Sequence, residues 1–216
     1  MRLPFSHDQF LAVFAAYNSK WWPVAALLWI LSAAAVAHVY LRRDRRASRV
    51  LAAVLAIQWL WVGAMYHLVY FRPINPAATW FGLIFLVEAG LLFWLGVVRS
   101  HLIFQPASSS WALPGALLIG YALLYPAIGA LTGLRYPEMP TFGVPCPTAL
   151  LTVGGLLLVP RREARPAAII PILWCAVGGS AAFLLAIPAD LMLLVAGAGL
   201  LIYILAPATR EAGATA

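Results

Sequence analysis

The chain has 216 residues, of which 64% are hydrophobic and only 10% are charged, so its composition excludes an ordinary soluble domain. Its formal net charge is +7, but the basic residues form short clusters between long apolar runs, which argues against a nucleic-acid partner. The composition predicts an all-α polytopic helix bundle whose main partner is the lipid bilayer.

The first segment, residues 1–20, is expected to form an amphipathic helix in the outer membrane interface. Ser6 and Gln9 have the spacing of a capping box, and apolar residues recur behind them at helical intervals. Two tryptophans then follow at headgroup depth, and Pro23 suits the first turn of the next span. Amphipathicity alone also fits a simple membrane anchor.

Seven later runs have the length needed to cross about 30 Å of hydrocarbon, which takes about 20 residues. They form one predicted transmembrane domain over residues 21–207, followed by a short cytoplasmic tail at 208–216. The predicted spans are 21–41, 49–71, 78–98, 112–133, 141–159, 167–187 and 190–207.

The loops between these spans alternate in basic content. Short cytoplasmic loops usually carry the excess of arginine and lysine. The N-terminus is therefore predicted outside and the C-terminus in the cytoplasm. The predicted location is the cytoplasmic (inner) membrane. The rich side holds Arg42, Arg43, Arg45, Arg46, Arg49, Arg99, Arg161, Arg162, Arg165 and Arg210, and the other side holds Arg2, Lys20, Arg72 and Arg135.

The fifth span is predicted to be broken near the outer leaflet. Its sequence, "YPEMPTFGVPCPTALLTVGG", is rich in proline upstream of Pro147, and a proline disfavours helical backbone in the residue before it. A helix that starts at Pro147 and ends before Pro160 is roughly 20 Å long. The chain before it would enter the membrane as non-helical backbone, which needs protein or a wet cavity around it.

Cys146 lies at the start of this short helix. The helix dipole and free amide groups there favour a thiolate, whereas a tight turn with an inert buried thiol is the alternative interpretation. Cys175 is predicted nearer to the middle of the membrane, so both cysteines are expected to be free thiols.

His67 in the second span is expected roughly 6 Å below its outer end, beside Tyr66. A histidine at that depth normally faces the bundle interior and can be a structural hydrogen-bonder, a proton carrier or a metal ligand. Thiolate and imidazole together suit a soft metal ion such as copper(I) or mercury(II), although Cys146 and His67 make an incomplete ligand set.

Further polar residues are predicted in the same leaflet, namely Asn75, Tyr136, Thr148 and Asp190. Glu88 lies near the middle of the third span, where a carboxyl group usually faces a partner or a water path. It is either a proton-coupling group or a protonated side chain that binds a neighbouring helix.

Several classes of protein are excluded by what the sequence lacks. Its only lysine is Lys20, outside the predicted spans, so a retinal Schiff base has no place in a helix. There is no phosphate-binding glycine loop, HExxH pair, CxxC or CxxCH motif. No cofactor can be assigned from the sequence.

Four stretches resemble a known family, namely "FSHDQFLAVFAAYN…WWP", "YHLVYFRPINPAATWFG", "YPEMPTFGVPCPT" and "LWCAVGGSAAF". The chain is similar over nearly its whole length to a family of small bacterial multi-spanning membrane proteins of unknown function, some members of which are labelled permease. The resemblance implies a self-contained family and no particular activity.

Three functions fit these observations. A transporter or channel for a small solute or soft metal ion would use a shallow outer site around His67 and Cys146, with Glu88 for proton coupling. A membrane-embedded enzyme acting on a lipid or other apolar molecule would use Cys146 or a water bound to His67, helped by Tyr66, Tyr136 or Asp190. The third is a structural or accessory subunit, and a homo-oligomer is compatible with each.

Overall fold

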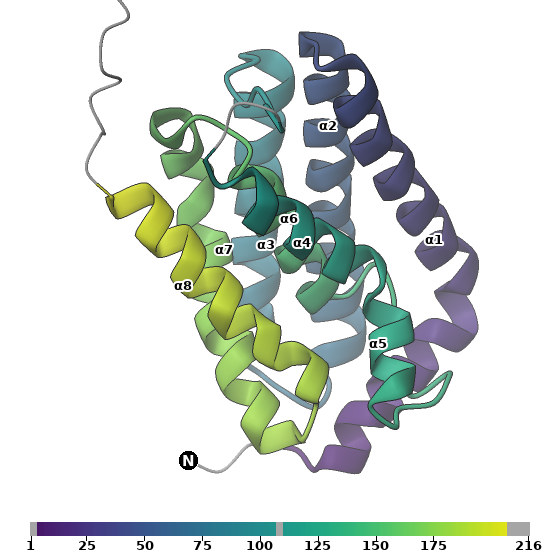
Figure 1. Cartoon of the computed structure of the whole chain (residues 1–216). Coiled ribbons are helices and arrows are strands. Elements are labelled where there is room, and N and C mark those ends of the chain that lie inside the picture. Colours follow the sequence, from purple (N-terminus) through teal and green to yellow (C-terminus); the bar gives the residue numbers. More distant parts are fainter. Residues whose placement is uncertain (1–3, 107–109, 207–216) are drawn as a thin grey trace, which may run out of the picture.

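The computed structural model describes residues 4–106 and 110–206, and these contain helices and no strands. Each helix packs side by side with its neighbours in one bundle (Figure 1). In chain order the elements are α1 (His7–Arg42), α2 (Arg45–Trp61), η1 (Val62–Phe71), α3 (Ala78–Leu92), η2 (Phe93–Val98), α4 (Ala112–Leu123), α5 (Tyr125–Leu131), α6 (Pro145–Leu156), α7 (Arg161–Leu185), η3 (Pro188–Leu191) and α8 (Met192–Leu205).

Five described helices are long and apolar enough to cross a membrane: α1, α2 with η1, α3 with η2, α7, and η3 with α8. The pair α4 and α5 makes a sixth if it is one span, but it bends by 67°, whereas the sequence predicted one segment over residues 112–133. The bend falls just before Pro126, which lies in the first turn of α5 and disfavours continued helix upstream.

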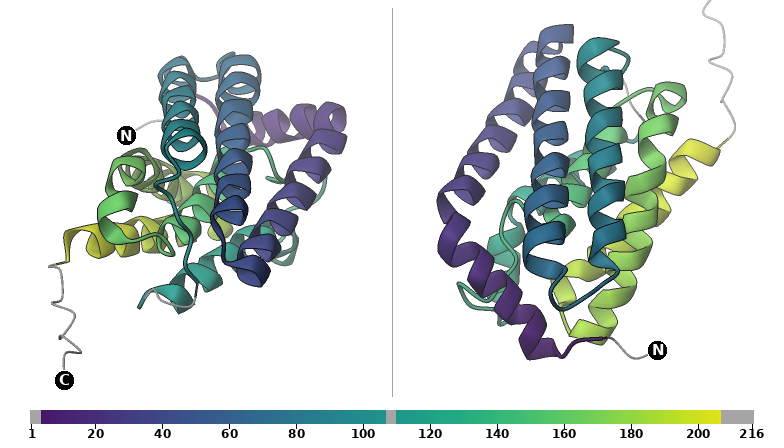
Figure 2. Two further views of the ribbon diagram at one scale, coloured as in Figure 1. Left: turned by 90° about the horizontal axis from the view of Figure 1, so that it is seen from above. Right: turned by 180° about the vertical axis from the view of Figure 1, so that it is seen from behind.

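The short helix α6 lies at the centre of the bundle, and all twelve of its residues are buried. It contacts α2, α4, α7 and α8 (Figure 1). Seen from behind, α1, α2 and α3 stand side by side, with α7 beside α3 (Figure 2). Twelve helical residues measure roughly 18 Å, so α6 alone is shorter than the hydrocarbon layer.

The start of α6 differs from the prediction. The helix begins at Pro145 rather than Pro147, so Cys146 is helical and not extended. Both prolines lie in the first turn, where the backbone N–H groups have no helical partner and proline therefore loses no hydrogen bond. The conformational bias of a residue before proline is overcome here by burial in the protein core.

The N-terminal part of α1 is one wall of the bundle. The predicted capping box is confirmed, because the Ser6 side chain accepts from the Gln9 N–H and the Gln9 side chain accepts from the Ser6 N–H. Helical geometry is interrupted at Trp21, two residues before Pro23. The buried stripe before this kink packs into the core and comprises Phe10, Val13, Phe14 and Tyr17.

Residues 132–144, between α5 and α6, are held in place by α1. Asn18 is fully buried, and its Nδ2 donates to the carbonyl oxygens of Pro137 and Met139, each at 2.7 Å. Its Oδ1 accepts from Thr141 Oγ1 at 2.6 Å, and its own carbonyl accepts from Tyr136 Oη at 3.2 Å. Asn18 thus replaces the hydrogen bonds that this non-helical backbone lacks.

Gly143 closes this segment against α1. Its φ is +75°, a conformation that strains residues with a Cβ. A Cβ at this position would also collide with the hydroxyl of Tyr17, which donates to the Phe142 carbonyl at 3.5 Å and accepts from Trp61 Nε1 at 2.7 Å. Both the backbone angle and the packing therefore require glycine.

One end of the bundle carries most of the described arginines. Arg49 Nε donates to Ser100 Oγ at 2.7 Å, which joins the start of α2 to the segment after η2. Arg165 donates to the Ile204 carbonyl at 3.1 and 2.9 Å, and Arg161 donates to the Ala206 carbonyl at 2.6 Å. These cations satisfy carbonyls at the end of α8. The predicted tail 208–216 and residues Arg2 and Arg210 lie outside the described residues.

We predict that Asn18→Leu lowers the free energy of unfolding by about 2–4 kcal/mol, because it leaves the Pro137 and Met139 carbonyls unpaired and removes the 2.6 Å bond from the Thr141 hydroxyl. Tyr136→Phe is the control, since it removes one bond made by a side chain that is 57% exposed and should cost under about 0.5 kcal/mol. Thermal unfolding in detergent measures both, and equal effects would contradict the role of Asn18.

Candidate functional site

A cavity of about 610 Å³ lies at the end of the bundle where α1 begins and α7 ends. Its walls come from the N-terminal part of α1, from η1, from the start of α6, from the last turns of α7 and from η3. Most of the lining is apolar, and none of the described lining residues is a lysine or an arginine. Its polar or titratable lining residues include Tyr66, His67, Asn75, Cys146 and Asp190.

Tyr66 and His67 reach the cavity from η1, which is wound as a π-helix. The Arg72 N–H donates to the His67 carbonyl at 2.9 Å, which is the five-residue bond of that helix type. Neighbouring residues of a helix point in different directions, yet both side chains are almost completely buried, at 2% and 0% exposure. The π-helical winding of η1 extends over ten residues, which is longer than the single π-turns often found at functional sites.

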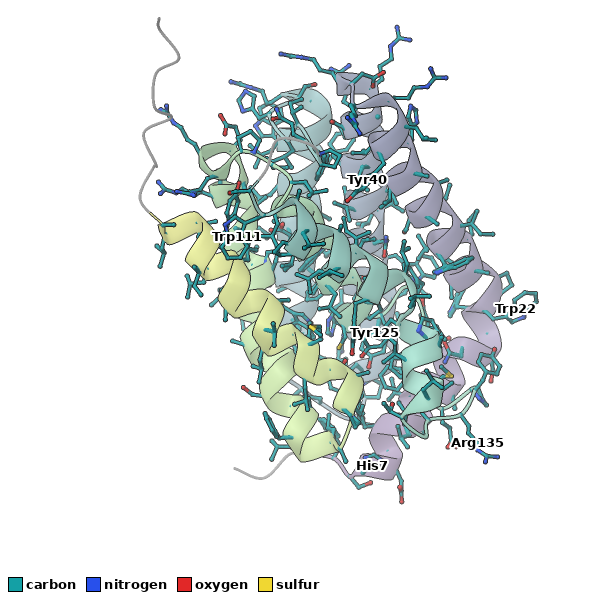
Figure 3. The ribbon with its side chains drawn as sticks, viewed as in Figure 1. His7, Trp22, Tyr40, Trp111, Tyr125 and Arg135 are labelled. Carbon is teal, nitrogen blue, oxygen red and sulfur yellow. The ribbon has the colours of Figure 1, made fainter. Side chains whose placement is uncertain are left out.

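Asp190 forms the polar end of the cavity with two partners. Tyr125 Oη donates to Asp190 Oδ1, and the Cys146 thiol lies within hydrogen-bonding reach of both residues. Figure 3 shows Tyr125 pointing into the bundle, whereas Trp22 and Arg135 point outward. A carboxyl group, a phenol and a thiol from three different segments therefore meet at the start of α6.

The sequence analysis separated the two cysteines by depth, but in the fold they are near each other. The thiols of Cys146 and Cys175 are close enough to interact electrostatically, and both are free and buried. The prediction of two free thiols is confirmed. The start of α6 therefore lies near the middle of α7.

The His67 ring packs against several aromatic rings. Its centre lies 4.7 Å from the ring centre of Phe85 and 5.2 Å from that of Trp174, both edge-to-face. The ring centres of Phe71 and Phe81 lie 6.1 and 5.8 Å from that of His67. Among the described residues, neither ring nitrogen of His67 has a hydrogen-bond partner, and the same holds for Trp174 Nε1.

Three other predicted site residues lie away from this cavity. Thr148 is buried in α6, where its hydroxyl donates to Gln58 Oε1 at 3.3 Å, and Gln58 Nε2 donates to Ser32 Oγ at 2.7 Å. Tyr136 lines a separate groove of about 360 Å³ beside α1 and α5. Glu88 is fully buried in α3, and neither of its oxygens has a partner among the described residues.

A complete metal site is not found within residues 4–106 and 110–206. No group of three or more His, Cys, Asp and Glu side chains there is close enough to hold an ion. Cys146 and His67 both line the cavity, but the nearest partners of Cys146 are a phenol and a carboxyl group. A soft metal ion prefers more thiolate or imidazole ligands than this.

Two residues of the site were not recognised as such from the sequence. Trp174 lies in the sixth predicted span and Tyr125 in the fourth, and neither was among the predicted site residues. Both lie at helical positions whose direction depends on how α5 and α7 pack. The proline after Tyr125 was the one available signal, because it marks the bend that turns this residue inward.

The bundle and its composition define a helical membrane protein. A model of the family described as "Family of unknown function (DUF6064)" matches residues 7–215, and the chain therefore belongs to that family. The resemblance noted from the sequence is thus confirmed as a resemblance to an uncharacterised family. No curated protein and no solved structure matches the chain.

We predict that His67→Phe raises the free energy of unfolding of the ligand-free protein by about 1–2 kcal/mol, because it removes two buried polar atoms that lack partners. The ring volume and aromatic contacts are retained. His101→Phe, at an exposed position, should change nothing. Chemical unfolding of delipidated samples measures the effect, and a loss of stability in His67→Phe would show that the imidazole has a structural partner.

Proposed function

We propose that this protein is a transporter for a small, largely apolar organic molecule, which enters the cavity from the outer side of the cytoplasmic membrane. In this proposal the chain crosses the membrane seven times, with the N-terminus outside and the C-terminus in the cytoplasm. The segment 1–20 lies in the outer interface, and α6 is the broken fifth span.

The proposal rests on one observation. A single cavity of about 610 Å³ is lined by four polar or titratable residues that the sequence predicted, namely Tyr66, His67, Cys146 and Asp190. Ligand pockets are typically of this size, with apolar walls and a few converging polar groups. An organic molecule is favoured over a metal ion, because the described residues hold no group of three ligands.

Two features favour transport over simple binding. A helix that begins inside a membrane protein beside a binding cavity is a recurring transporter design, and α6 begins at Pro145 on the cavity wall. Glu88 is a second feature, because it is a buried carboxyl group without a described partner on α3. It lies one turn from Phe85, which contacts the His67 ring.

The cluster of Cys146, Tyr125 and Asp190 favours an enzyme as the second candidate. A thiol within hydrogen-bonding reach of a carboxyl group is the beginning of a nucleophile and base pair. The cavity wall includes Val177 and Leu184, which are exposed on the surface of α7, so an apolar substrate in the membrane has a lateral route to this thiol.

The proposed orientation predicts opposite labelling of two introduced cysteines. Tyr136→Cys should react with a membrane-impermeant maleimide in intact cells, whereas Arg46→Cys should react only after permeabilisation. Both positions are exposed, and the native cysteines are buried. Labelling of Arg46→Cys in intact cells, with Tyr136→Cys protected, would reverse the orientation.

The transport proposal predicts a bound compound that can be extracted from the purified protein and identified by mass spectrometry. Ala181→Trp should remove it by filling the cavity, whereas Ala127→Trp in the separate groove should retain it. Liposomes containing the wild-type protein should accumulate this compound along a pH gradient. Glu88→Gln should bind it but accumulate at least about tenfold less, because the carboxyl group carries the coupled proton.

Different results separate the candidates. Chemical conversion of the compound by wild type but not by Cys146→Ser would support the enzyme and overturn transport. Undiminished accumulation by Glu88→Gln would remove the carboxyl group from the mechanism. Equal recovery of the compound from Ala181→Trp and wild type would show that it binds elsewhere.

A further inference from the structure

Two nitrogen-bearing rings stand side by side in the cavity wall without hydrogen-bond partners among the described residues. His67 is fully buried, and Trp174 places its Nε1 where no solvent reaches it. Their ring centres are 5.2 Å apart, and the rings meet edge to face at 71°. Both residues line the cavity, and their unpaired nitrogens lie in its wall, where a ligand would reach them by displacing the side chains that cover them.

The chemistry of these rings specifies what is missing. An indole Nε1 is a donor only, and a neutral imidazole carries one donor and one acceptor. A buried donor without an acceptor destabilises the protein, and a ligand that supplies the acceptor removes this cost. The shared requirement of the two residues is therefore an oxygen that can accept hydrogen bonds.

The surroundings argue against a charged ligand. No lysine or arginine is among the described residues that line the cavity, so an anion would find no countercharge there. Asp190 is the carboxyl group of the cavity, and it is already engaged by Tyr125 and Cys146. A cation would have to compete with both of these hydrogen bonds.

The aromatic walls indicate the shape of the ligand. Phe81 lines the cavity and contacts both the His67 ring and the Trp174 ring, and Phe85 contacts the same two rings without lining the cavity, with centres 4.7 to 5.8 Å apart. Phe10, Phe14 and Phe71 line the side formed by α1 and η1. Aromatic side chains favour stacked or edge-to-face contact with another planar ring.

We propose that the cavity binds an uncharged planar ring compound with carbonyl oxygens, of the quinone class, and that one oxygen accepts hydrogen bonds from Trp174 Nε1 and from the imidazole N–H of His67. This assignment rests on the proposed function, whose ligand class it names. Such a compound dissolves in the bilayer, which agrees with the lateral walls formed by α7.

The test compares two probes that differ only in the carbonyl oxygens, 2,3-dimethyl-1,4-naphthoquinone and 2,3-dimethylnaphthalene. The two methyl groups block addition of the Cys146 thiol to the quinone ring. Equilibrium dialysis against nanodiscs with and without the protein subtracts partition into lipid. We expect the quinone to bind about tenfold or more tightly than the hydrocarbon, since two buried donors gain an acceptor.

Three variants assign the hydrogen bonds. His67→Phe and Trp174→Phe keep a ring at each position and remove its nitrogens, so each should weaken quinone binding by about tenfold and leave hydrocarbon binding unchanged. Trp94→Phe is the matched control, because this tryptophan is exposed on η2 and does not line the cavity. It should bind both probes as wild type does.

Three other results would overturn the assignment. Equal affinity for quinone and hydrocarbon would remove the carbonyl requirement but leave the proposed apolar cargo intact. Tighter binding of the cation N-methylquinolinium would make Asp190 the recognition group. If wild type and Ala181→Trp both fail to bind either neutral probe, the cavity itself is not a binding site, and the proposed function falls with the inference.

Discussion

Backbone that leaves a helix inside an apolar bundle must find hydrogen bonds from side chains, and the fold depends on how this requirement is met. Asn18 and Tyr17 on α1 supply them to residues 132–144. Trp29 does the same for the bend between α4 and α5, where its Nε1 donates to the Leu123 carbonyl at 2.9 Å. The long first helix is therefore a source of polar partners for the irregular segments, and its position in turn fixes where α6 begins.

The location of α6 accounts for the geometry of the cavity. Because the chain before Pro145 is held against α1, the start of α6 is placed beside η3, and Cys146 comes within reach of Asp190 and Tyr125. Farther along the same helix, Thr152 accepts from Trp59 Nε1 at 2.8 Å, which joins α6 to α2. Polar contacts thus hold α6 at its start and again at Thr152, although its neighbours are mostly apolar. The cavity is the space beside the start of α6 that the packed side chains leave empty.

The sequence predicted the all-α fold and the long apolar helices, although it predicted seven spans and only five or six described segments are long and apolar enough to cross a membrane. It predicted only part of the candidate site, for a physical reason. Length and hydropathy locate a span and the depth of each residue, so Tyr66, His67, Cys146 and Asp190 could be assigned to one level. Depth does not tell which way a side chain points around its helix. Tyr136 and Thr148 were assigned to the same level, yet they face other contacts. The π-helical turns depend on packing between helices and leave little local pattern, whereas the bend at Leu124 is marked by the nearby Pro126.

The complete burial of α6 has a consequence for how the protein is made. A helix of this length with no side chain facing lipid gains little from entering the bilayer alone. Two of its neighbours, α2 and α4, precede it in the chain, and the other two, α7 and α8, follow it. During synthesis α6 therefore stays only partly covered until α7 and α8 have been made. Its packing is complete only after α8 has joined the bundle, so insertion and folding of this part of the chain are coupled steps.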